Sequence, residues 1–428
     1  MLPRLFLSFW LISVAWPVNA APDKDLQALS NIIEAVCLPS KAGYVFKRER
    51  LADILPGASF VSTKRLPLRR GASRVTHIYA APNDEQISFV SIMRGGVGLR
   101  LATEMSRSSR PTANIISGSG CEVRQGRIIR YDTKGIARKL VIYSANFEKV
   151  LGREPLNPPI PPGTDVAGVT VVHVDSGIAY DQPHLAARLA RDKAGRILGA
   201  DLWDEDGLPY DADTSLSPFM VRRHGSLVAD VLLREGPPIR LVPIRYPRNN
   251  MNKFLQVVEI AYKVGAKIVA LPMGSNTENE WSAFRDAAAR HPEILFVVSA
   301  GNNGRDIDAR PVYPAAFTLK NLLVVTSVTE SGLIARGSNW GAVAVDIGVP
   351  AEQLSARDYR GSERPVAGSS FAVPRVTALA ARLKAVNPLW QAGQLKAAIL
   401  GLATPVTGRN GAPLLGSGWI SENKLKKS

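Results

Sequence analysis

A run of β-branched residues that ends in a carboxylate constrains the fold of this chain more than any other segment. Residues 169–174 (Val-Thr-Val-Val-His-Val) contain no Lys, Arg, Asp or Glu and continue directly into Asp175. Such uncharged runs are typical of strands that are buried on both faces of a parallel sheet. Open α/β sheets place their functional groups at the carboxyl ends of these strands. We therefore expect an α/β fold in which Asp175 lies at a functional edge of the sheet.

Other polar residues with catalytic potential follow later in the chain. A second apolar run, residues 295–300, leads through a glycine into Asn302, whose side-chain amide can donate to an oxyanion. His224 precedes a glycine and a helical apolar pattern. Ser370 opens a long Ala/Leu-rich segment, where the N–H groups of a helix N-terminus favour developing negative charge. Together with Asp175, these residues supply the acid, base, oxyanion donor and nucleophile of a hydrolase.

Each of these residues also has a purely structural interpretation. Ser369 and Ser370 are suitable helix N-caps, and Asp before Ser-Gly is common in turns. Asn302 begins an Asn-Asn-Gly turn, and His224 can be a surface histidine. A structural explanation requires all of these coincidences in one chain order, so the catalytic interpretation is favoured.

The order Asp, His, Asn, Ser resembles that of the subtilases, the subtilisin-like serine peptidases. The resemblance extends from about residue 164 to about residue 420. The matching motifs are 174–178 (Val-Asp-Ser-Gly-Ile), 224–229 (His-Gly-Ser-Leu-Val-Ala), 300–302 (Ala-Gly-Asn) and 368–374 (Gly-Ser-Ser-Phe-Ala-Val-Pro). The resemblance implies a subtilisin-like, doubly wound parallel sheet with flanking helices.

The resemblance also implies a role for each motif residue. Ser370 would attack the scissile carbonyl, His224 would take its proton, and Asp175 would orient and stabilise the imidazole. Asn302 and the Ser370 N–H would stabilise the oxyanion. Ser370 is favoured over Ser369 because the family nucleophile directly precedes a Met-Ala pair, which is Phe-Ala in this chain. The implied activity is that of a serine endopeptidase acting on protein or peptide substrates.

Substrate peptides of this family bind as an added strand between two edges. The residues implied to contact substrate are Pro272, Met273, Gly274, Ala300 and Gly301, with residues 243–250 as the opposing edge. Both edges depart from the family pattern, because Pro272 lacks a backbone donor and the opposing edge is bulky and cationic. We expect Arg245 and Arg248 to favour acidic residues upstream of the cut. The alternative is a non-catalytic, subtilase-fold binding protein of the cell envelope.

The first residues predict export. Residues 1–20 have a positive charge, a mostly apolar run of about 12 residues and a small-residue cleavage site, which together are typical of a secretory signal peptide. No later apolar run reaches the length of a membrane span, so we expect no integral membrane segment after cleavage, and a periplasmic or extracellular location. In an oxidising compartment Cys37 and Cys121 are expected to pair, although two buried free thiols remain the alternative.

Length and composition predict two domains. The chain has 428 residues, too many for one ordinary core, and residues 156–163 form a Pro-rich linker. Residues 21–155 are expected to be a smaller α+β domain, with a helix over 25–37 and a small antiparallel sheet, and residues 164–428 the peptidase domain. Strand-like pieces occur at 75–79, 87–92, 97–101, 128–131 and 140–143. The N-terminal domain can be a removed propeptide or a retained accessory domain.

The distribution of charge limits the kinds of binding partner that the sequence predicts. The formal net charge is +16, with the excess clearest in the N-terminal domain, so an anionic envelope surface is a possible partner and a merely solvated basic surface the alternative. No nucleic-acid motif accompanies the charge, so no nucleic-acid partner is expected.

No cofactor and no metal site are expected. Structural calcium in the acidic segment 201–213 is only an option, since its spacing is not that of an EF-hand.

Overall fold

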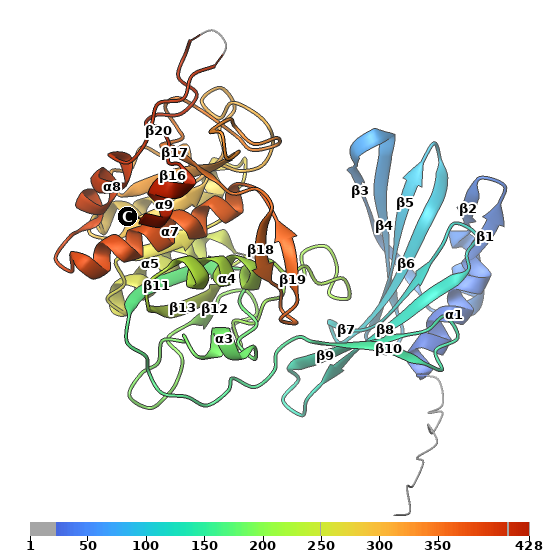
Figure 1. Cartoon of the computed structure of the whole chain (residues 1–428). Helices are drawn as coiled ribbons and strands as arrows, with labels where there is room; N and C mark the ends of the chain where they lie inside the picture. The colour runs from blue at the N-terminus through green and yellow to red at the C-terminus, as the bar shows by residue number, and fades with distance from the viewer. Residues whose placement is uncertain (1–22, 249, 409–410, 428) are drawn as a thin grey trace, which may run out of the picture. The chain divides into compact units, whose positions relative to one another are not determined.

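The computed structural model describes residues 23–248, 250–408 and 411–427. The predicted signal peptide, residues 1–20, lies outside the described residues. The chain divides into two compact units, Met1–Pro155 and Leu156–Ser428, which we call the N-terminal unit and the C-terminal unit (Figure 1). No described helix is long and apolar enough to cross a membrane.

The N-terminal unit is an antiparallel sheet with one long helix packed on it. Its helices are α1 (Lys24–Val36) and α2 (Leu51–Ile54), with single turns η1 (Arg48–Arg50) and η2 (Arg69–Gly71). Its strands are β1 (Cys37–Ser40), β2 (Gly43–Phe46), β3 (Ser59–Pro67), β4 (Ala72–Ala81), β5 (Glu85–Arg94), β6 (Val97–Arg107), β7 (Arg110–Ser117), β8 (Val123–Tyr131), β9 (Ala137–Tyr143) and β10 (Val150–Pro155). The sheet is larger than the small one expected, since ten strands join it within the described part of the chain.

Helix α1 forms because its apolar residues recur on one face. The residues that this face buries are Leu26, Leu29, Ile32, Ile33 and Val36. Asp23 caps the helix by accepting the Asp25 N–H at 3.0 Å. The buried face packs on β6, β7 and β8, where it shares a core with Phe89 and Ile115. At the end of α1, Cys37 forms a disulfide with Cys121, so the expected pairing is present.

Removing this disulfide is expected to destabilise the N-terminal unit strongly. The bond closes a loop with a sequence separation of 84 residues. Loop-closure entropy then predicts a loss of about 4.5 kcal/mol in the free energy of unfolding for the double variant Cys37→Ser/Cys121→Ser. Urea denaturation followed by circular dichroism measures this loss, and reduced wild-type protein should lose a similar amount. An unchanged midpoint in both samples would contradict the prediction.

The C-terminal unit is built on a parallel sheet with the order β12-β13-β11-β14-β15-β16-β17-β20. Its strands are β11 (Val169–Asp175), β12 (Ala200–Asp201), β13 (Ile239–Arg245), β14 (Ile268–Leu271), β15 (Leu295–Ser299), β16 (Leu322–Val328), β17 (Ile347–Pro350) and β20 (Gly418–Trp419), with a separate hairpin of β18 (Leu354–Arg357) and β19 (Glu363–Val366). The chain runs from β11 to β13 on one side and then crosses to β14 on the other. The switch point between β11 and β14 is where such sheets form a crevice.

Helices cover both faces of this sheet, as the doubly wound fold predicts (Figure 1). They are α3 (Pro183–Ala186), α4 (Gly225–Glu235), α5 (Phe254–Lys263), α6 (Ser282–Arg290), α7 (Ser369–Val386), α8 (Ala392–Leu400) and α9 (Glu422–Lys427), with single turns η3 (Met251–Lys253) and η4 (Glu278–Trp281). Successive residues of β11 face opposite layers. Val171 packs in the core shared by α4 and α7, whereas Val172 packs in the core shared by α5 and α6. Burial on both faces explains the uncharged run that precedes Asp175.

The Pro-rich linker lies against the C-terminal unit and has no helix or strand of its own. The Tyr180 hydroxyl donates to the Pro158 carbonyl at 2.8 Å, and the Arg191 guanidinium donates to the Pro161 carbonyl at 2.7 Å. These bonds hold an extended, proline-stiffened segment in place rather than leaving it as a free spacer.

Candidate active site

The carboxyl ends of β11, β14 and β15 bring the motif residues together. Asp175 is the last residue of β11, and His224 immediately precedes α4. Asn302 follows the end of β15, and Ser370 is the second residue of α7. The His224 and Phe371 rings lie 5.6 Å apart, so the histidine is next to the residue that follows the serine. Segments separated by almost 200 positions thus meet at one edge of the sheet, as parallel strand order requires.

Asp175 and His224 form a carboxylate–imidazole pair in which the carboxylate is buried. The Nδ1 atom of His224 lies 2.9 Å from each Asp175 carboxylate oxygen. Asp175 is 3% exposed, whereas the His224 side chain is 38% exposed, so the imidazole faces the site. Because a carboxylate accepts hydrogen bonds, Nδ1 carries the proton. The Nε2 atom is then left with a lone pair and can accept a proton from a nucleophile.

Burial opposes charge on both groups, but their mutual attraction outweighs it. Burial alone would raise the pKa of the Asp175 carboxyl, yet the charge of His224 and its hydrogen bond bring that pKa below its ordinary value. Burial alone would lower the pKa of the His224 imidazole, yet the charge of Asp175 and its hydrogen bond raise it above its ordinary value. The pair is therefore suited to hold a proton on His224 next to an ionised Asp175.

Asp211, which the sequence predicts only as one residue of an acidic segment, fixes the position of His224. This fully buried carboxylate accepts the His224 backbone N–H at 3.1 Å and the Ser226 N–H at 2.9 Å. Both donors lie at the start of α4, where negative charge is stabilised by the helix dipole. The Ser176 hydroxyl also donates to Asp211, at 2.7 Å. No sequence pattern distinguishes Asp211 from its acidic neighbours, since its partners come from other segments.

The amide of Asn302 is oriented by Ser369. The Ser369 N–H and hydroxyl donate to the Asn302 Oδ1 at 3.0 and 2.9 Å. Because Oδ1 is occupied by these donors, the Nδ2 group points the other way and is free to donate. The Ser299 hydroxyl lies 2.7 Å from that of Ser369 and extends this chain of buried hydroxyls. Gly368 has φ 112°, a conformation that lets the backbone turn toward Asn302.

Asn339 holds the segment that precedes Asn302. The side-chain amide of Asn339 donates to the Ala300 carbonyl at 2.8 Å, and the Asn339 backbone N–H donates to the Gly301 carbonyl at 3.0 Å. Ala300 is fully buried, so this predicted substrate contact is not at the surface of the site. Asn339 therefore fixes the turn that carries Asn302, while a substrate contact at Gly301, which is not buried, stays a prediction.

The Ser370 hydroxyl donates to the Pro272 carbonyl at 3.2 Å. Pro272, Met273 and Gly274 in turn line a cavity of about 390 Å³. The other residues that line this cavity are Asp175, Ser176, Asp213, Arg222, Arg223, His224, Tyr246, Arg248, Met251, Ser275 and Trp281. Both edges expected to hold a peptide therefore face the same cavity as the imidazole.

Arg245 does not contribute to this cavity, so its expected contact with acidic substrate residues is wrong. Its side chain is 1% exposed and points into the protein. It pairs with Asp201 at 3.0 Å and with Asp204 at 2.5 Å, and it lies 4.8 Å from the Trp203 ring. The side chain of Arg245, the last residue of β13, therefore forms ion pairs with the acidic segment and is not available to a substrate. The sequence alone does not show that these two segments are in contact.

The same contacts weigh against calcium in the acidic segment. Asp201 forms an ion pair with Arg245, and Asp213 forms one with Arg222. Asp211 accepts a backbone hydrogen bond at the start of α4. Within the described ranges, no three His, Cys, Asp or Glu side chains are grouped so that they could hold a metal ion. These three carboxylates are therefore already satisfied by partners within the chain.

Comparison with known proteins identifies relatives of this chain. Residues 167–419 match the sequence model of the subtilase family. Halolysin of Haloferax mediterranei is 26% identical over 237 residues, covering 52% of this chain and 43% of that protein. Subtilisin BL of Lederbergia lenta is 26% identical over 174 residues, covering 41% of this chain and 61% of that protein. The chain thus spans less than two thirds of the length of either relative.

Solved structures resemble part of this chain as well. A lanthipeptide protease has 19% sequence identity and a TM-score of 0.48, covering 60% of this chain and 87% of that one. A cold adapted subtilisin-like serine proteinase has 20% identity and a TM-score of 0.47, covering 63% and 93%. The family match extends over more than half of the sequence, from the strand that ends in Asp175 to the final strand of the sheet. The chain therefore belongs to the subtilase family.

Proposed function

We propose that this chain is an exported serine endopeptidase that hydrolyses peptide bonds with Asp175, His224 and Ser370. The observation that carries the proposal is the pairing of His224 Nδ1 with both Asp175 oxygens at 2.9 Å. This pairing leaves Nε2 as the base, near the helix whose second residue is Ser370. Membership of the subtilase family supports the same activity.

In the proposed reaction, Ser370 first leaves the Pro272 carbonyl and turns toward His224. Its Oγ attacks the substrate carbonyl carbon while its proton moves to Nε2 of His224. Collapse of the tetrahedral intermediate breaks the C–N bond, and His224 returns the proton to the leaving amine. Water then attacks the acyl-enzyme by the same steps, releasing the acid and restoring Ser370. Asp175 stays ionised throughout and stabilises the imidazolium.

Peptide binding is supported by an unpaired edge of backbone. Among the residues that the structure describes, the N–H and C=O groups of Met273 and Gly274 have no hydrogen-bond partner within the protein. Gly274 is exposed, and a Cβ there would lie 2.7 Å from the Tyr313 carbonyl, so no larger residue fits without a shift. An extended peptide can pair with these free groups as an added strand. Pro272 removes one donor from this edge but leaves the rest intact.

Asn302 is proposed to stabilise the oxyanion through Nδ2. We expect Asn302→Ala to lower kcat by about 10²- to 10³-fold with little change in KM, because the donor acts on charge that exists only in the transition state. Steady-state kinetics on a chromogenic peptide measures this loss. Asn303→Ala, which changes the same residue type one position later, should retain nearly full kcat. Equal losses in both variants would contradict the assignment.

The proposed activity is tested by labelling with a fluorophosphonate probe together with casein cleavage. Wild-type protein should be labelled and should cleave casein, whereas Ser370→Ala should do neither. Ser369→Ala is the matched control, and it should still be labelled because Ser369 orients Asn302 and is not the nucleophile. If no labelling depends on Ser370, the alternative of a non-catalytic binding protein is favoured. The hydrogen bond from Ser370 to Pro272 is the observation that keeps this alternative open.

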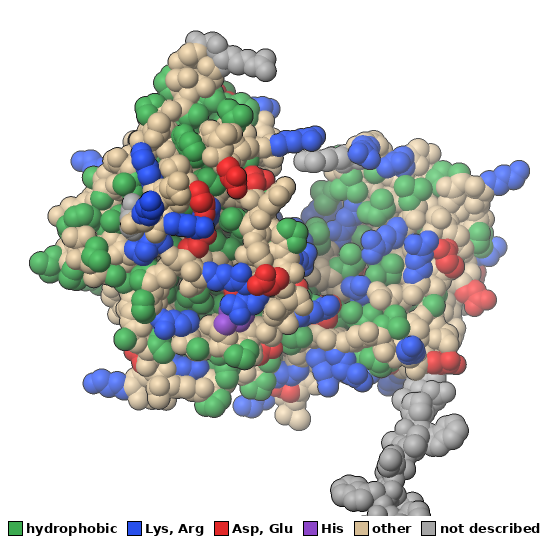
Figure 2. All heavy atoms as spheres, in the orientation of Figure 1, with side chains coloured by type: hydrophobic (Ala, Val, Ile, Leu, Met, Phe, Trp, Pro, Cys, Tyr) green, Lys and Arg blue, Asp and Glu red, His purple; other side chains and the backbone are tan. Residues whose placement is uncertain are grey.

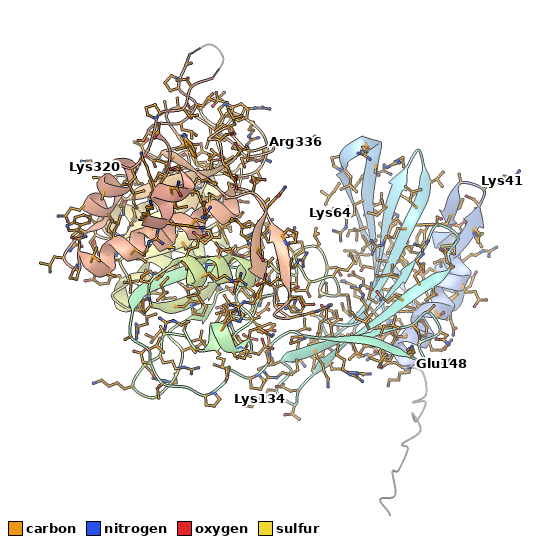
Figure 3. All side chains as sticks on the ribbon, in the orientation of Figure 1. Lys41, Lys64, Lys134, Glu148, Lys320 and Arg336 are labelled. Carbon is orange, nitrogen blue, oxygen red and sulfur yellow. A yellow bond between two sulfur atoms is a disulfide. The ribbon has the colours of Figure 1, made fainter. Side chains whose placement is uncertain are left out.

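The N-terminal unit is proposed to be retained as an accessory domain and exported with the peptidase. Its disulfide and its helix-packed core support a stable domain. Lysine and arginine side chains are spread over the visible surface of the protein, and Lys64 is one that the N-terminal unit exposes (Figures 2 and 3). Contact of this unit with an anionic envelope surface stays a prediction. Mass and N-terminal sequence of the exported protein test retention, and a start near residue 160 would contradict it.

A further inference from the structure

We infer that Arg248 makes this peptidase prefer substrates with an acidic side chain on the acyl side of the scissile bond. The inference rests on the proposed function and specifies its substrate class. Arg248 lines the cavity that also contains His224 and the edge formed by Pro272, Met273 and Gly274. A peptide paired with that edge would therefore lie in the same cavity as this arginine.

The backbone holds Arg248 near the catalytic carboxylate. Strands β13 and β14 lie on either side of β11, so the segments that follow them border the site from opposite sides. The Tyr246 N–H donates to the Asp175 carbonyl at 2.9 Å, and the Arg248 N–H donates to the Tyr246 carbonyl at 3.0 Å. Two successive hydrogen bonds therefore tie the Arg248 backbone to the end of β11.

Arg248 is the arginine of this cavity whose side chain is free to meet a substrate, as far as the described residues show. Arg222 is paired with Asp213, and Asp175 is paired with His224. Arg223 packs its guanidinium 4.2 Å from the centre of the Tyr359 ring and donates to the Asp211 carbonyl. The Arg248 side chain is exposed and has no carboxylate or hydrogen-bond partner among the residues described by the structure. A substrate carboxylate would supply the missing partner.

The rest of the cavity does not select against an acidic residue. Asp213 is paired with Arg222, and Asp175 is only 3% exposed and hydrogen-bonded to His224, so neither carboxylate is presented unpaired to a substrate. An arginine fork can accept a carboxylate in a bidentate geometry, which an uncharged amide cannot match. Since Arg248 is exposed to solvent, the attraction is partly screened and the preference should be moderate and salt-dependent.

The test compares peptides that carry Glu or Gln at successive positions on the acyl side. For wild-type full-length protein we expect kcat/KM to be about fivefold higher for Glu at one or more positions, and the ratio to fall as NaCl is added. Arg248→Glu should bring the Glu/Gln ratio to one or below. Arg336→Glu makes the same charge change at an exposed arginine outside the cavity and should keep the wild-type ratio (Figure 3).

The outcomes separate this inference from the proposed function. If Ser370-dependent cleavage occurs but the Glu/Gln ratio is one at every position, or Arg248→Glu leaves the ratio unchanged, Arg248 does not select the substrate. If Arg336→Glu lowers the ratio as much as Arg248→Glu, long-range charge rather than this site is responsible, and the inference fails as well. If no peptide is cleaved in a Ser370-dependent manner, the endopeptidase function itself is wrong.

Discussion

Replacing His224 with alanine is expected to lower kcat by about 10⁶-fold while the fold is retained. Without the imidazole, the Ser370 proton has no acceptor and the leaving amine has no proton donor, so both halves of the reaction lose their acid–base catalyst. The residual rate should come from the oxyanion donors and substrate binding alone. The measurement is single-turnover cleavage of an activated peptide ester or anilide, with thermal unfolding as a check on the fold.

A double variant tests whether the histidine and serine act as one unit. His224→Ala/Ser370→Ala should be about as slow as either single variant, because each single change already disables the same proton transfer. His184→Ala is the matched control, since His184 pairs with Asp230 and lies outside the cavity. It should keep kcat within a small factor. Additive losses in the double variant would mean that His224 and Ser370 act independently, contrary to the proposed mechanism.

Asp175→Asn is expected to lower kcat by about 10⁴-fold. An asparagine amide can donate to Nδ1 and thereby favour the tautomer whose proton sits on Nε2, which cannot act as a base. The change also removes the charge that raises the pKa of His224. Wild-type kcat/KM should rise with pH through a midpoint above about 6.5, the ordinary histidine value, as His224 loses its proton. In Asp175→Asn that midpoint should move to lower pH.

A variant of a second buried carboxylate, Asp230, distinguishes an effect on catalysis from an effect on stability. Asp230 is fully buried and accepts the Arg357 N–H at 2.9 Å and the Arg234 Nε at 2.8 Å, away from the cavity. Asp230→Asn should lower Tm, because a buried amide cannot replace the charge-assisted hydrogen bonds that Asp230 accepts from Arg234 and Arg357, yet the variant should retain kcat below the melting transition. Asp175→Asn should show the reverse pattern. Similar losses of activity in both variants would indicate that Asp175 acts through the fold.

The sequence predicted those parts of the structure that depend on local pattern. The uncharged run before Asp175 is strand β11, and the apolar run before Asn302 is β15. The helix expected over 25–37 is α1, displaced by one residue. In each case the pattern directly reflects burial, on both faces of a strand or on one face of a helix.

The remaining features depend on contacts between distant segments. The antiparallel sheet of the N-terminal unit is larger than predicted, because some of its hairpin turns lack the usual sequence signal. In the turn between β6 and β7, Ser108 and Ser109 both adopt positive φ, a conformation that glycine or asparagine usually supplies. Arg245 was expected at the surface, but the acidic segment folds over it. Asp211 gained its role only because α4 begins beside it. No local sequence pattern predicts these contacts between distant segments.

The covalent link between Cys37 and Cys121 also determines what proteolysis of this protein would look like. A single backbone cut anywhere between these residues yields two fragments that remain joined and migrate as one species until the bond is reduced. A cut in residues 156–163, whose carbonyls at Pro158 and Pro161 are held by side chains, instead frees a separate piece under all conditions. Electrophoresis with and without reductant can thus distinguish a nicked but undivided chain from a matured one.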